Sequence, residues 1–155
     1  MKAKTSDNKI KIQRFWLAVA SREHVLRGSA QGFAQFCHGK LAPARRVSQG
    51  DGLIYYSSKE TYSPKQLCQK FTAIGFISNE APYQVEMAPG FCPYRRDVRY
   101  LKSREAEIRP LIARLEFIKD KIHWGKEMRF GFLEIPGKDF DLIASAMAVK
   151  RQITD

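Results

Sequence analysis

The sequence predicts an α+β domain, a small antiparallel sheet or barrel flanked by helices, on three observations. Five runs of strand length follow one another closely up to residue 101. Two apolar patterns at helical spacing come after them. With 155 residues, of which 44% are hydrophobic, the chain can bury one core but hardly two. We therefore expect one domain whose short strands close on themselves, because closure removes exposed edges.

The expected strands are short runs rich in apolar and aromatic residues, bounded by turn residues. The first, 15–20, reads Phe-Trp-Leu-Ala-Val-Ala and is apolar on both faces, which indicates an interior strand. The runs 71–77 and 83–87 are separated by a turn at 78–82, so we expect them to form a hairpin. The other expected strands are 53–57, 91–101 and 130–135.

Helices are expected near both ends of this series. Ser21 offers an N-cap hydroxyl, Glu23 supplies negative charge in the first turn and Gly28 can close the turn, so 22–27 is predicted as a short helix. Apolar residues at helical spacing predict a packing helix over 108–118 and a terminal helix that starts at 136. The remaining segments are expected as a loop or short strand at 28–40, a basic turn at 42–47 and a loop at 119–128.

The chain carries a formal charge of +11, which predicts a polyanionic partner. Nucleic acid is the commonest such partner, although charge alone does not separate DNA from RNA, or either from an acidic membrane surface. Residues 1–13 hold four lysines against one Asp and are expected to form a flexible basic N-terminal arm. The domain is then expected at 14–149 and a C-terminal tail at 150–155.

Several protein classes lack support in this sequence. The polar start of the chain has no apolar core of a signal peptide, and no run approaches the roughly 18 apolar residues of a membrane span, so we expect a cytoplasmic protein with no membrane partner. The three cysteines show neither disulfide nor zinc spacing, and the usual phosphate-cradling and hydrolytic motifs are missing. We expect a binding module rather than an enzyme, with no cofactor and no metal.

The run at 91–101 interleaves tyrosines with arginines. Rings stack on bases and guanidinium groups bind phosphate oxygens, a combination suited to nucleic acid. The alternative is that the tyrosines pack while the arginines are solvated or paired with Asp97. On a strand, the residues of one face would be Tyr94, Arg96, Val98 and Tyr100, and those of the other Arg95, Asp97 and Arg99.

Six segments, in order along the chain, resemble the EVE domain family; they are 15–21, 32–40, 50–57, 71–75, 83–87 and 92–98. Ile-Arg-Pro-Leu-Ile at 108–112 and Arg-Phe-Gly at 129–131 also fit, so the resemblance runs from Arg14 to about Met147. It implies a PUA-like fold, a small mixed β-barrel with flanking helices, related to the YTH domains that read a methylated adenine in RNA. It further implies a module that binds RNA or modified DNA and reads a modified base flipped into an aromatic pocket.

The resemblance also implies a set of site residues. Ser21 matches the serine that lines the YTH pocket, although Ala20 stands where that family has lysine. Phe33 takes the place of a cage tryptophan, and Tyr83 is expected as the second wall. The edge of the base and the close approach of the backbone are assigned to Gln35, His38 and Gly39. The expected phosphate contacts are Lys40, Arg45, Arg95 and Arg96.

Two other functions stay open at this point. One is a general RNA-binding PUA-like domain without a preference for modification, and a competition between modified and plain oligonucleotides would separate it from a reader. The other is an enzyme acting on a nucleotide or amide, which would need a paired catalytic residue.

Overall fold

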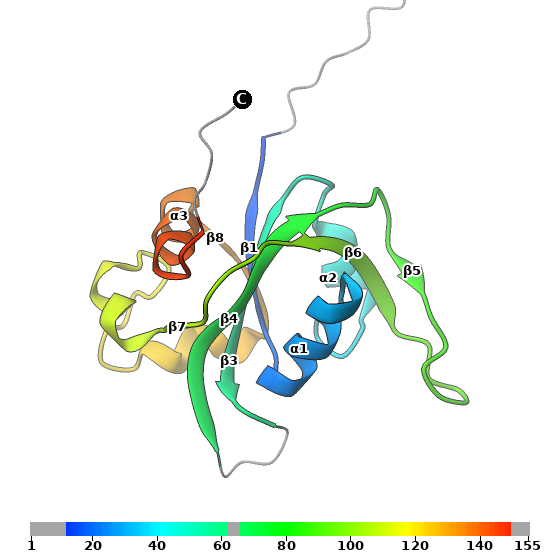
Figure 1. Cartoon of the computed structure of the whole chain (residues 1–155), viewed down its shortest axis with the longest axis horizontal. Helices are drawn as coiled ribbons and strands as arrows, with labels where there is room; N and C mark the ends of the chain where they lie inside the picture. The colour runs from blue at the N-terminus through cyan, green and yellow to red at the C-terminus, as the bar shows by residue number, and fades with distance from the viewer. Residues whose placement is uncertain (1–11, 62–65, 150–155) are drawn as a thin grey trace, which may run out of the picture.

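The computed structural model describes residues 12–61 and 66–149, and one curled sheet organises them (Figure 1). The strands are β1 (Phe15–Val19), β2 (Phe33–Ala34), β3 (Gly52–Lys59), β4 (Leu67–Ile77), β5 (Tyr83–Gln84), β6 (Tyr94–Tyr100), β7 (Ala106–Glu107) and β8 (Phe132–Ile135). The α-helices are α1 (Arg22–Gln31), α2 (Leu41–Arg46) and α3 (Gly137–Ala146), and the 3-10 helices are η1 (Arg109–Arg114) and η2 (Trp124–Phe130).

The sheet has the order β2-β6-β4-β3-β1-β8, and β5 and β7 join it through β6 and β4. It forms a curled half-barrel with flanking helices, so the expected α+β class is confirmed. Apart from residues 12 and 13, the arm expected at 1–13 lies outside the described residues, as does the tail expected at 150–155. None of the helices in the described ranges is long and apolar enough to cross a membrane.

The centre of the sheet is a parallel pair, β1 and β3, which the sequence patterns did not predict. Phe15 pairs with Gly52 and Val19 with Tyr56. Two parallel strands need a crossover between them, and α1, β2 and α2 form that crossover. Since β1 also pairs antiparallel with β8 and β3 with β4, the sheet is mixed rather than purely antiparallel.

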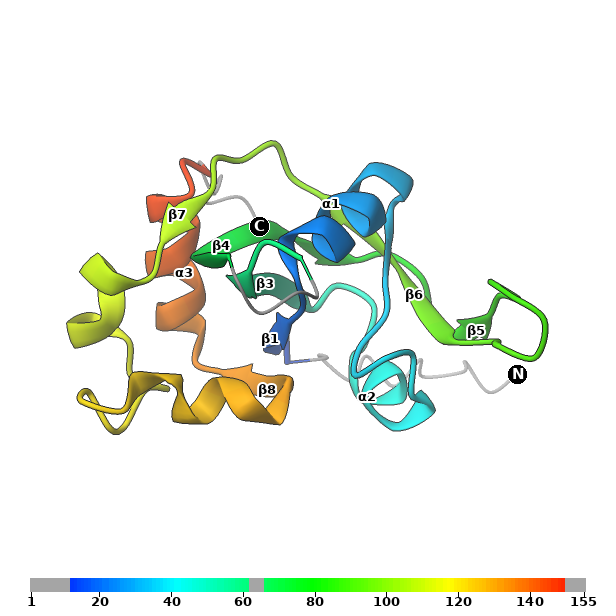
Figure 2. The same ribbon diagram turned by 90° about the horizontal axis from the view of Figure 1, so that it is seen from below.

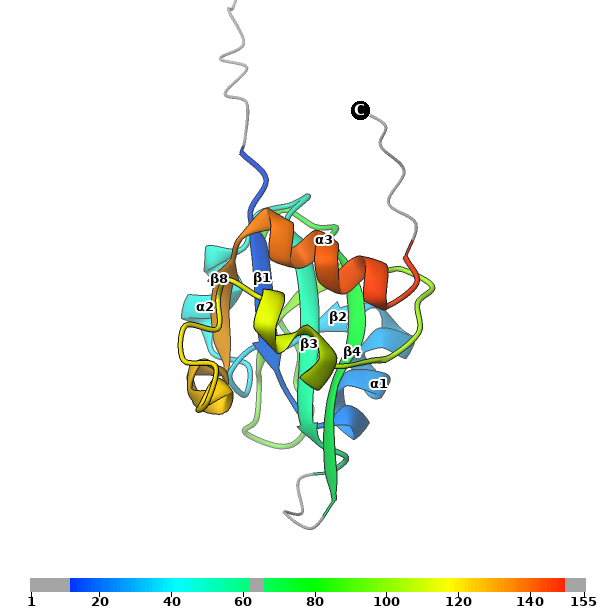
Figure 3. The same cartoon turned by 90° about the vertical axis from the view of Figure 1, so that its left-hand side faces the viewer.

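The central strands are buried on both faces because their successive side chains point into two different cores. Leu17 and Ile54 pack in one core with Phe140 of α3. Trp16 lies in the other core with Val25 of α1. Figure 3 shows α3 crossing one face of the sheet, while α1 and α2 cover the other in Figure 1. The interior strand expected at 15–20 is therefore confirmed as β1.

The hairpin expected between 71–77 and 83–87 is wrong. β4 pairs with β3, β6 and β7, whereas the fourth strand is reduced to Tyr83–Gln84 and pairs with β6. Pairing Ile77 with Val98 brings Val98, 4% exposed, into the core. Both residues of β5 are exposed, so burial favours β6 as the neighbour of β4.

The first helix is longer than predicted. α1 ends at Gln31, where Gly32 takes a left-handed φ of 79°. Gly28 is buried inside the helix instead, and a Cβ there would lie 2.8 Å from the carbonyl oxygen of Phe33. Glycine is thus needed at this position for a close chain approach rather than for a turn.

The other expected segments compare with the structure as follows. The turn expected at 42–47 forms the helix α2, and the terminal helix is confirmed as α3. The packing helix expected at 108–118 is only η1, and the loop expected at 119–128 contains most of η2.

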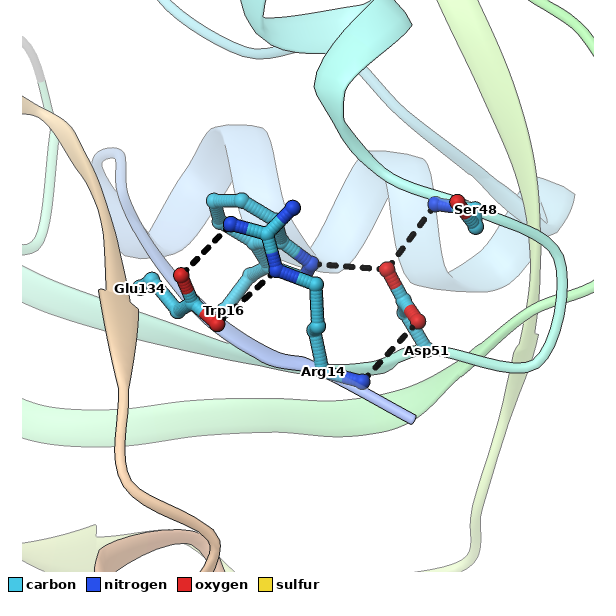
Figure 4. Close-up of polar contacts among 5 residues, drawn as sticks. All are labelled: Arg14, Trp16, Ser48, Asp51 and Glu134. Carbon is cyan, nitrogen blue, oxygen red and sulfur yellow. Dashed lines mark hydrogen bonds and ion pairs between the residues drawn. The ribbon is translucent and has the colours of Figure 1, made fainter. Parts of the chain in front are cut away.

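Asp51 holds the beginning of β1 against β3 (Figure 4). This buried carboxylate accepts the indole N–H of Trp16 at 2.9 Å. It also accepts the backbone N–H groups of Ser48 at 2.9 Å and Arg14 at 3.1 Å. The Arg14 guanidinium in turn contacts Glu134 on β8 at 2.6 and 2.9 Å. Three neighbouring strands are therefore joined at this end of the sheet.

Arg96, on the inner face of β6, is 1% exposed. Its Nη1 donates to the carbonyl oxygens of Ala44 at 2.9 Å and Val47 at 2.5 Å. Its Nε and Nη2 donate to the side-chain and backbone oxygens of Asn79 at 3.0 and 2.7 Å. The side chain therefore fixes α2 and the chain after β4 to β6. Since every one of these contacts is internal, the expected role of Arg96 in phosphate binding is corrected to a structural one.

We predict that Arg96→Ala lowers the free energy of unfolding by about 3 kcal/mol or more, because it leaves the two buried carbonyl oxygens of Ala44 and Val47 without this donor. The matched control is Arg99→Ala on the exposed face of the same strand, where loss of a contact to the Phe76 ring costs about 1 kcal/mol or less. Urea denaturation measures both values. Equal losses for the two variants would contradict the structural role of Arg96.

Candidate functional site

A cavity of about 760 Å³ opens at the edge of the sheet where β1 and β3 end. Parallel strands end at the same edge, so the residues that follow β1 lie beside the last residues of β3. The start of α1, the chain after β2 and the segment before β8 complete the walls. We call this space the Ser21 cavity; its lining residues are Val19, Ala20, Ser21, Glu23, His24, Arg27, Gln35, Cys37, His38, Ser58, Lys59, Thr61, Arg129, Phe130 and Gly131.

Backbone hydrogen bonds hold the walls of the Ser21 cavity together. The N–H of Val19 donates to the carbonyl of Gly131 at 2.9 Å, which fixes the segment before β8. The N–H of Ala20 donates to Tyr56 at 3.1 Å, and the N–H of Glu23 donates to Glu60 at 2.9 Å. The main chain therefore defines the shape of the cavity before any ligand is present.

Ser21 begins α1 as the sequence predicts. Its hydroxyl accepts the backbone N–H of His24 at 3.3 Å, the N-cap bond. Ser21 lines the cavity, and its hydroxyl, which accepts in this bond, keeps its own proton for donation to another acceptor. Burial, together with the nearby charges of Arg27, His38 and Arg95, lowers the pKa of His24 below its usual 6.5, so this ring is neutral at neutral pH.

Gln35 presents a fixed amide to the cavity. Its Oε1 accepts from Nε of Arg95 at 2.5 Å, and the Arg95 guanidinium lies 3.7 Å from the centre of the Phe33 ring. Because the bond from arginine engages the amide oxygen, Gln35 is left to offer N–H donors to a ligand. Arg95 thus acts on the cavity through Gln35 and does not line it itself.

His38 lines the cavity from a tight turn. Cys37, His38 and Gly39 all have left-handed backbone, with φ values of 48°, 63° and 84°. A Cβ on Gly39 would lie 2.2 Å from the Cβ of Pro93, and its carbonyl accepts from the N–H of Tyr94 at 2.8 Å. Gly39 therefore anchors the turn against the start of β6 and is not itself among the residues that line the Ser21 cavity.

The expected aromatic walls lie elsewhere. Phe33 is 7% exposed under Arg95, and Tyr83 on β5 donates its hydroxyl to Asp97 at 2.5 Å. Neither ring lines the Ser21 cavity, so the structure brings together only Ser21, Gln35 and His38 from the expected base-binding set. The ring that does line it is Phe130, which is 74% exposed.

The cations of the cavity also differ from those expected. Lys40 and Arg45 are exposed but lie outside the lining, whereas Arg27, Lys59 and Arg129 belong to it. Arg-Phe-Gly at 129–131 was part of the family resemblance, yet nothing in that motif alone indicated where its ring would point. Within the described ranges, no three His, Cys, Asp or Glu residues come together in a way that could hold a metal ion.

The profile of the EVE domain matches residues 14–146. The chain belongs to the EVE domain family. A UPF0310 protein of Mesorhizobium japonicum is 48% identical over 143 residues, which are 91% of this chain and 96% of that protein. Another UPF0310 protein, from Bacillus licheniformis, is 50% identical over 127 residues, or 82% of this chain and 86% of that protein.

Solved structures share the fold of this EVE domain. The NMR structure of Rpa0253 from Rhodopseudomonas palustris matches with a TM-score of 0.59 at 14% identity, covering 92% of this chain and 98% of that one. The YTH domain of the Zygosaccharomyces rouxii MRB1 protein, solved in complex with N6-methyladenosine RNA, matches with a TM-score of 0.54 at 18% identity, covering 94% and 93%. The chain therefore shares the fold of a YTH domain, as the sequence resemblance implies.

We predict that the EVE domain loses stability relative to its His24→Gln variant as the pH falls from about 7.5 to about 5.5. The lowered pKa means that the unfolded chain takes up the proton first, so acid favours unfolding of the wild type through this residue. At pH values well above the ordinary pKa of 6.5, the free energies of unfolding of the wild type and of His24→Gln should differ by a constant amount. Urea denaturation at several pH values measures the difference, and a difference that stays constant down to the lowest pH would contradict the prediction.

Proposed function

We propose that this EVE domain binds nucleic acid and holds one unstacked base in the Ser21 cavity. The observation that carries the proposal is the mixture of groups in one cavity: an exposed ring, neutral hydrogen-bonding groups and cations. A volume of about 760 Å³ lies within the range of sites that enclose a small molecule. A single base with part of its sugar falls into that class of ligand.

The ring and the polar groups match the two ways in which proteins hold a flipped base. Phe130 offers a flat face for stacking, which contributes about 1–3 kcal/mol per base. Gln35 offers N–H donors, while His38 and Ser21 can complete the contacts to a base edge. Together these contacts offset the loss of stacking in the free strand.

The cations favour the strand that carries the base. Lys59 and Arg129 line the cavity, as does Arg27, whose guanidinium is paired with Glu23 at 3.2 Å, and the whole chain has a formal charge of +11. Phosphate contacts of this kind do not depend on sequence, but they weaken steeply as salt is added. Binding that did not change with salt would therefore count against the proposal.

We further propose that the base read in the cavity is modified, in RNA or in DNA, and that the domain acts by binding rather than by catalysis. The YTH domain that shares this fold was solved with RNA containing N6-methyladenosine, which supports a modified base as the ligand. A reader needs shape and stacking, both of which the cavity walls can supply, and no paired catalytic group.

One observation favours general RNA binding as a second candidate. Phe130 is the only Phe, Tyr or Trp among the described residues that line the Ser21 cavity, where the other rings are the imidazoles of His24 and His38, so a cage of several large rings around a methyl group is not formed by the described residues. A single ring stacks on any base because every base has a π-face. Competition between modified and plain oligonucleotides of the same sequence decides between the two candidates.

We predict that Phe130→Ala weakens oligonucleotide binding by about tenfold or more, because it removes the stacking surface. The matched control is Phe91→Ala, which removes a ring that is 45% exposed and lies outside the cavity, and should leave affinity unchanged. The assay is fluorescence anisotropy with single- and double-stranded oligonucleotides that carry different modified bases. An unaltered affinity of Phe130→Ala, or an equal loss in both variants, would argue against the cavity as the base site.

A further inference from the structure

We infer that a second site beside the Ser21 cavity binds the nucleotides that flank the captured base, so that the strand runs along η2. This inference rests on the proposed function. The second site is a hollow of about 500 Å³, here called the Trp124 cavity, whose walls include Ile122, His123, Trp124, Lys126 and Arg129. It is lined by one short stretch of chain, residues 120–129.

The two cavities are joined through one element. Arg129 lines both of them. Trp124, the first residue of η2, lines the second cavity, and Phe130, its last residue, lines the first. At a rise of about 2 Å per residue, the axis of this 3-10 helix covers about 12 Å between them. A strand with one base in the Ser21 cavity would therefore reach the Trp124 cavity with the nucleotides next to it.

The chemistry of the Trp124 cavity suits a single strand. Ile122 is 85% exposed, so its apolar side chain lies in solvent and is open to contact. The half-buried Trp124 ring lies with it in the same walls. Lys126 and Arg129 are exposed cations on η2. Apolar and aromatic surface for bases, beside cations for phosphates, is the usual composition of single-strand sites.

The acidic residue of this cavity is already engaged. The Asp120 carboxylate accepts the backbone N–H groups of Ile122 at 3.1 Å and His123 at 2.9 Å. It also lies 3.0 Å from Nδ1 of the His123 ring. These contacts shape the turn before η2 and offset part of the negative charge, so Asp120 opposes a phosphate less than a free carboxylate would.

The other exposed apolar feature is less suited to a strand. The segment between β5 and β6 projects at the far end of the molecule from α3 (Figure 2) and exposes Met87 and Phe91, each at 45%. Residues 84–92 contain Glu86 and no Lys or Arg. Without a cation of its own, this projection lacks a partner for phosphate, whereas η2 supplies two.

The test uses a single-stranded RNA of about nine nucleotides with N6-methyladenosine at its centre, a length within the usual range of single-strand sites. The variant is Ile122→Ala/Lys126→Ala. The matched control is Leu67→Ala/Lys102→Ala, which removes an apolar residue that is 67% exposed and an exposed lysine outside both cavities. We expect roughly tenfold weaker binding for the variant and a smaller salt dependence, with the control unchanged.

Tryptophan fluorescence gives a second readout. Of the two tryptophans, Trp16 is fully buried, so quenching on addition of the RNA should come from Trp124. Trp124→Phe should remove the quenching while most of the binding remains. This readout reports where the strand lies and does not depend on the stability of the double variant.

The outcomes separate this inference from the proposed function. Suppose that Phe130→Ala loses binding, that the double variant binds the RNA as tightly as the wild type, and that the RNA does not quench the tryptophan fluorescence of the wild type. The Trp124 site is then overturned and the Ser21 cavity stands. If affinity falls in Met87→Ala/Phe91→Ala instead, the strand runs over the β5 side and the inference is wrong. If the wild type binds no RNA and no modified DNA oligonucleotide, both the inference and the proposed function fail.

Discussion

The parallel pairing of β1 with β3 is the constraint on which the rest of the site depends. Because both strands run in the same direction, the chain after Val19 lies beside the last residues of β3 at one edge of the sheet. α1 begins there and turns back over the sheet, which leaves Ser21 in the wall of the cavity. An antiparallel pair would send these two ends to opposite edges, and the Ser21 cavity would not form.

Burial on both faces fixes the register between β1 and β3. β1 and β3 contribute side chains to two cores, so neither strand can shift along the other without moving apolar residues to the wrong face. The buried carboxylate of Asp51 fixes the opposite end of β1, and the buried guanidinium of Arg96 fixes α2 to β6. The ring of Phe130, by contrast, is exposed where η2 ends at Gly131, whose φ is 74°. The cavity thus combines walls held by backbone hydrogen bonds with an exposed stacking surface.

Much of the fold was predictable from the sequence, because local patterns report burial directly. The run 15–20, apolar on both faces, matches a strand between two cores, and Ser21 caps α1 as its position indicates. The parallel pairing was not predictable in this way, since hydrophobic alternation assigns faces but not neighbours. Nor does a short amphipathic run reveal that 108–118 forms a 3-10 helix and irregular chain rather than an α-helix.

The site was only partly predictable for a related reason. Ser21, Gln35 and His38 were indicated by the family resemblance, and they meet in the cavity because they lie shortly after β1 and β2. Arg96 was expected at the surface because most arginines are exposed, yet the alternation along β6 places it on the same inner face as Val98. The most direct test of the account is backbone amide shift mapping by NMR with the methylated RNA of about nine nucleotides used above. The account predicts the largest shifts at Val19, Ser21, Gln35, His38 and Gly131; shifts centred on β5 and α2, with none at these residues, would contradict it.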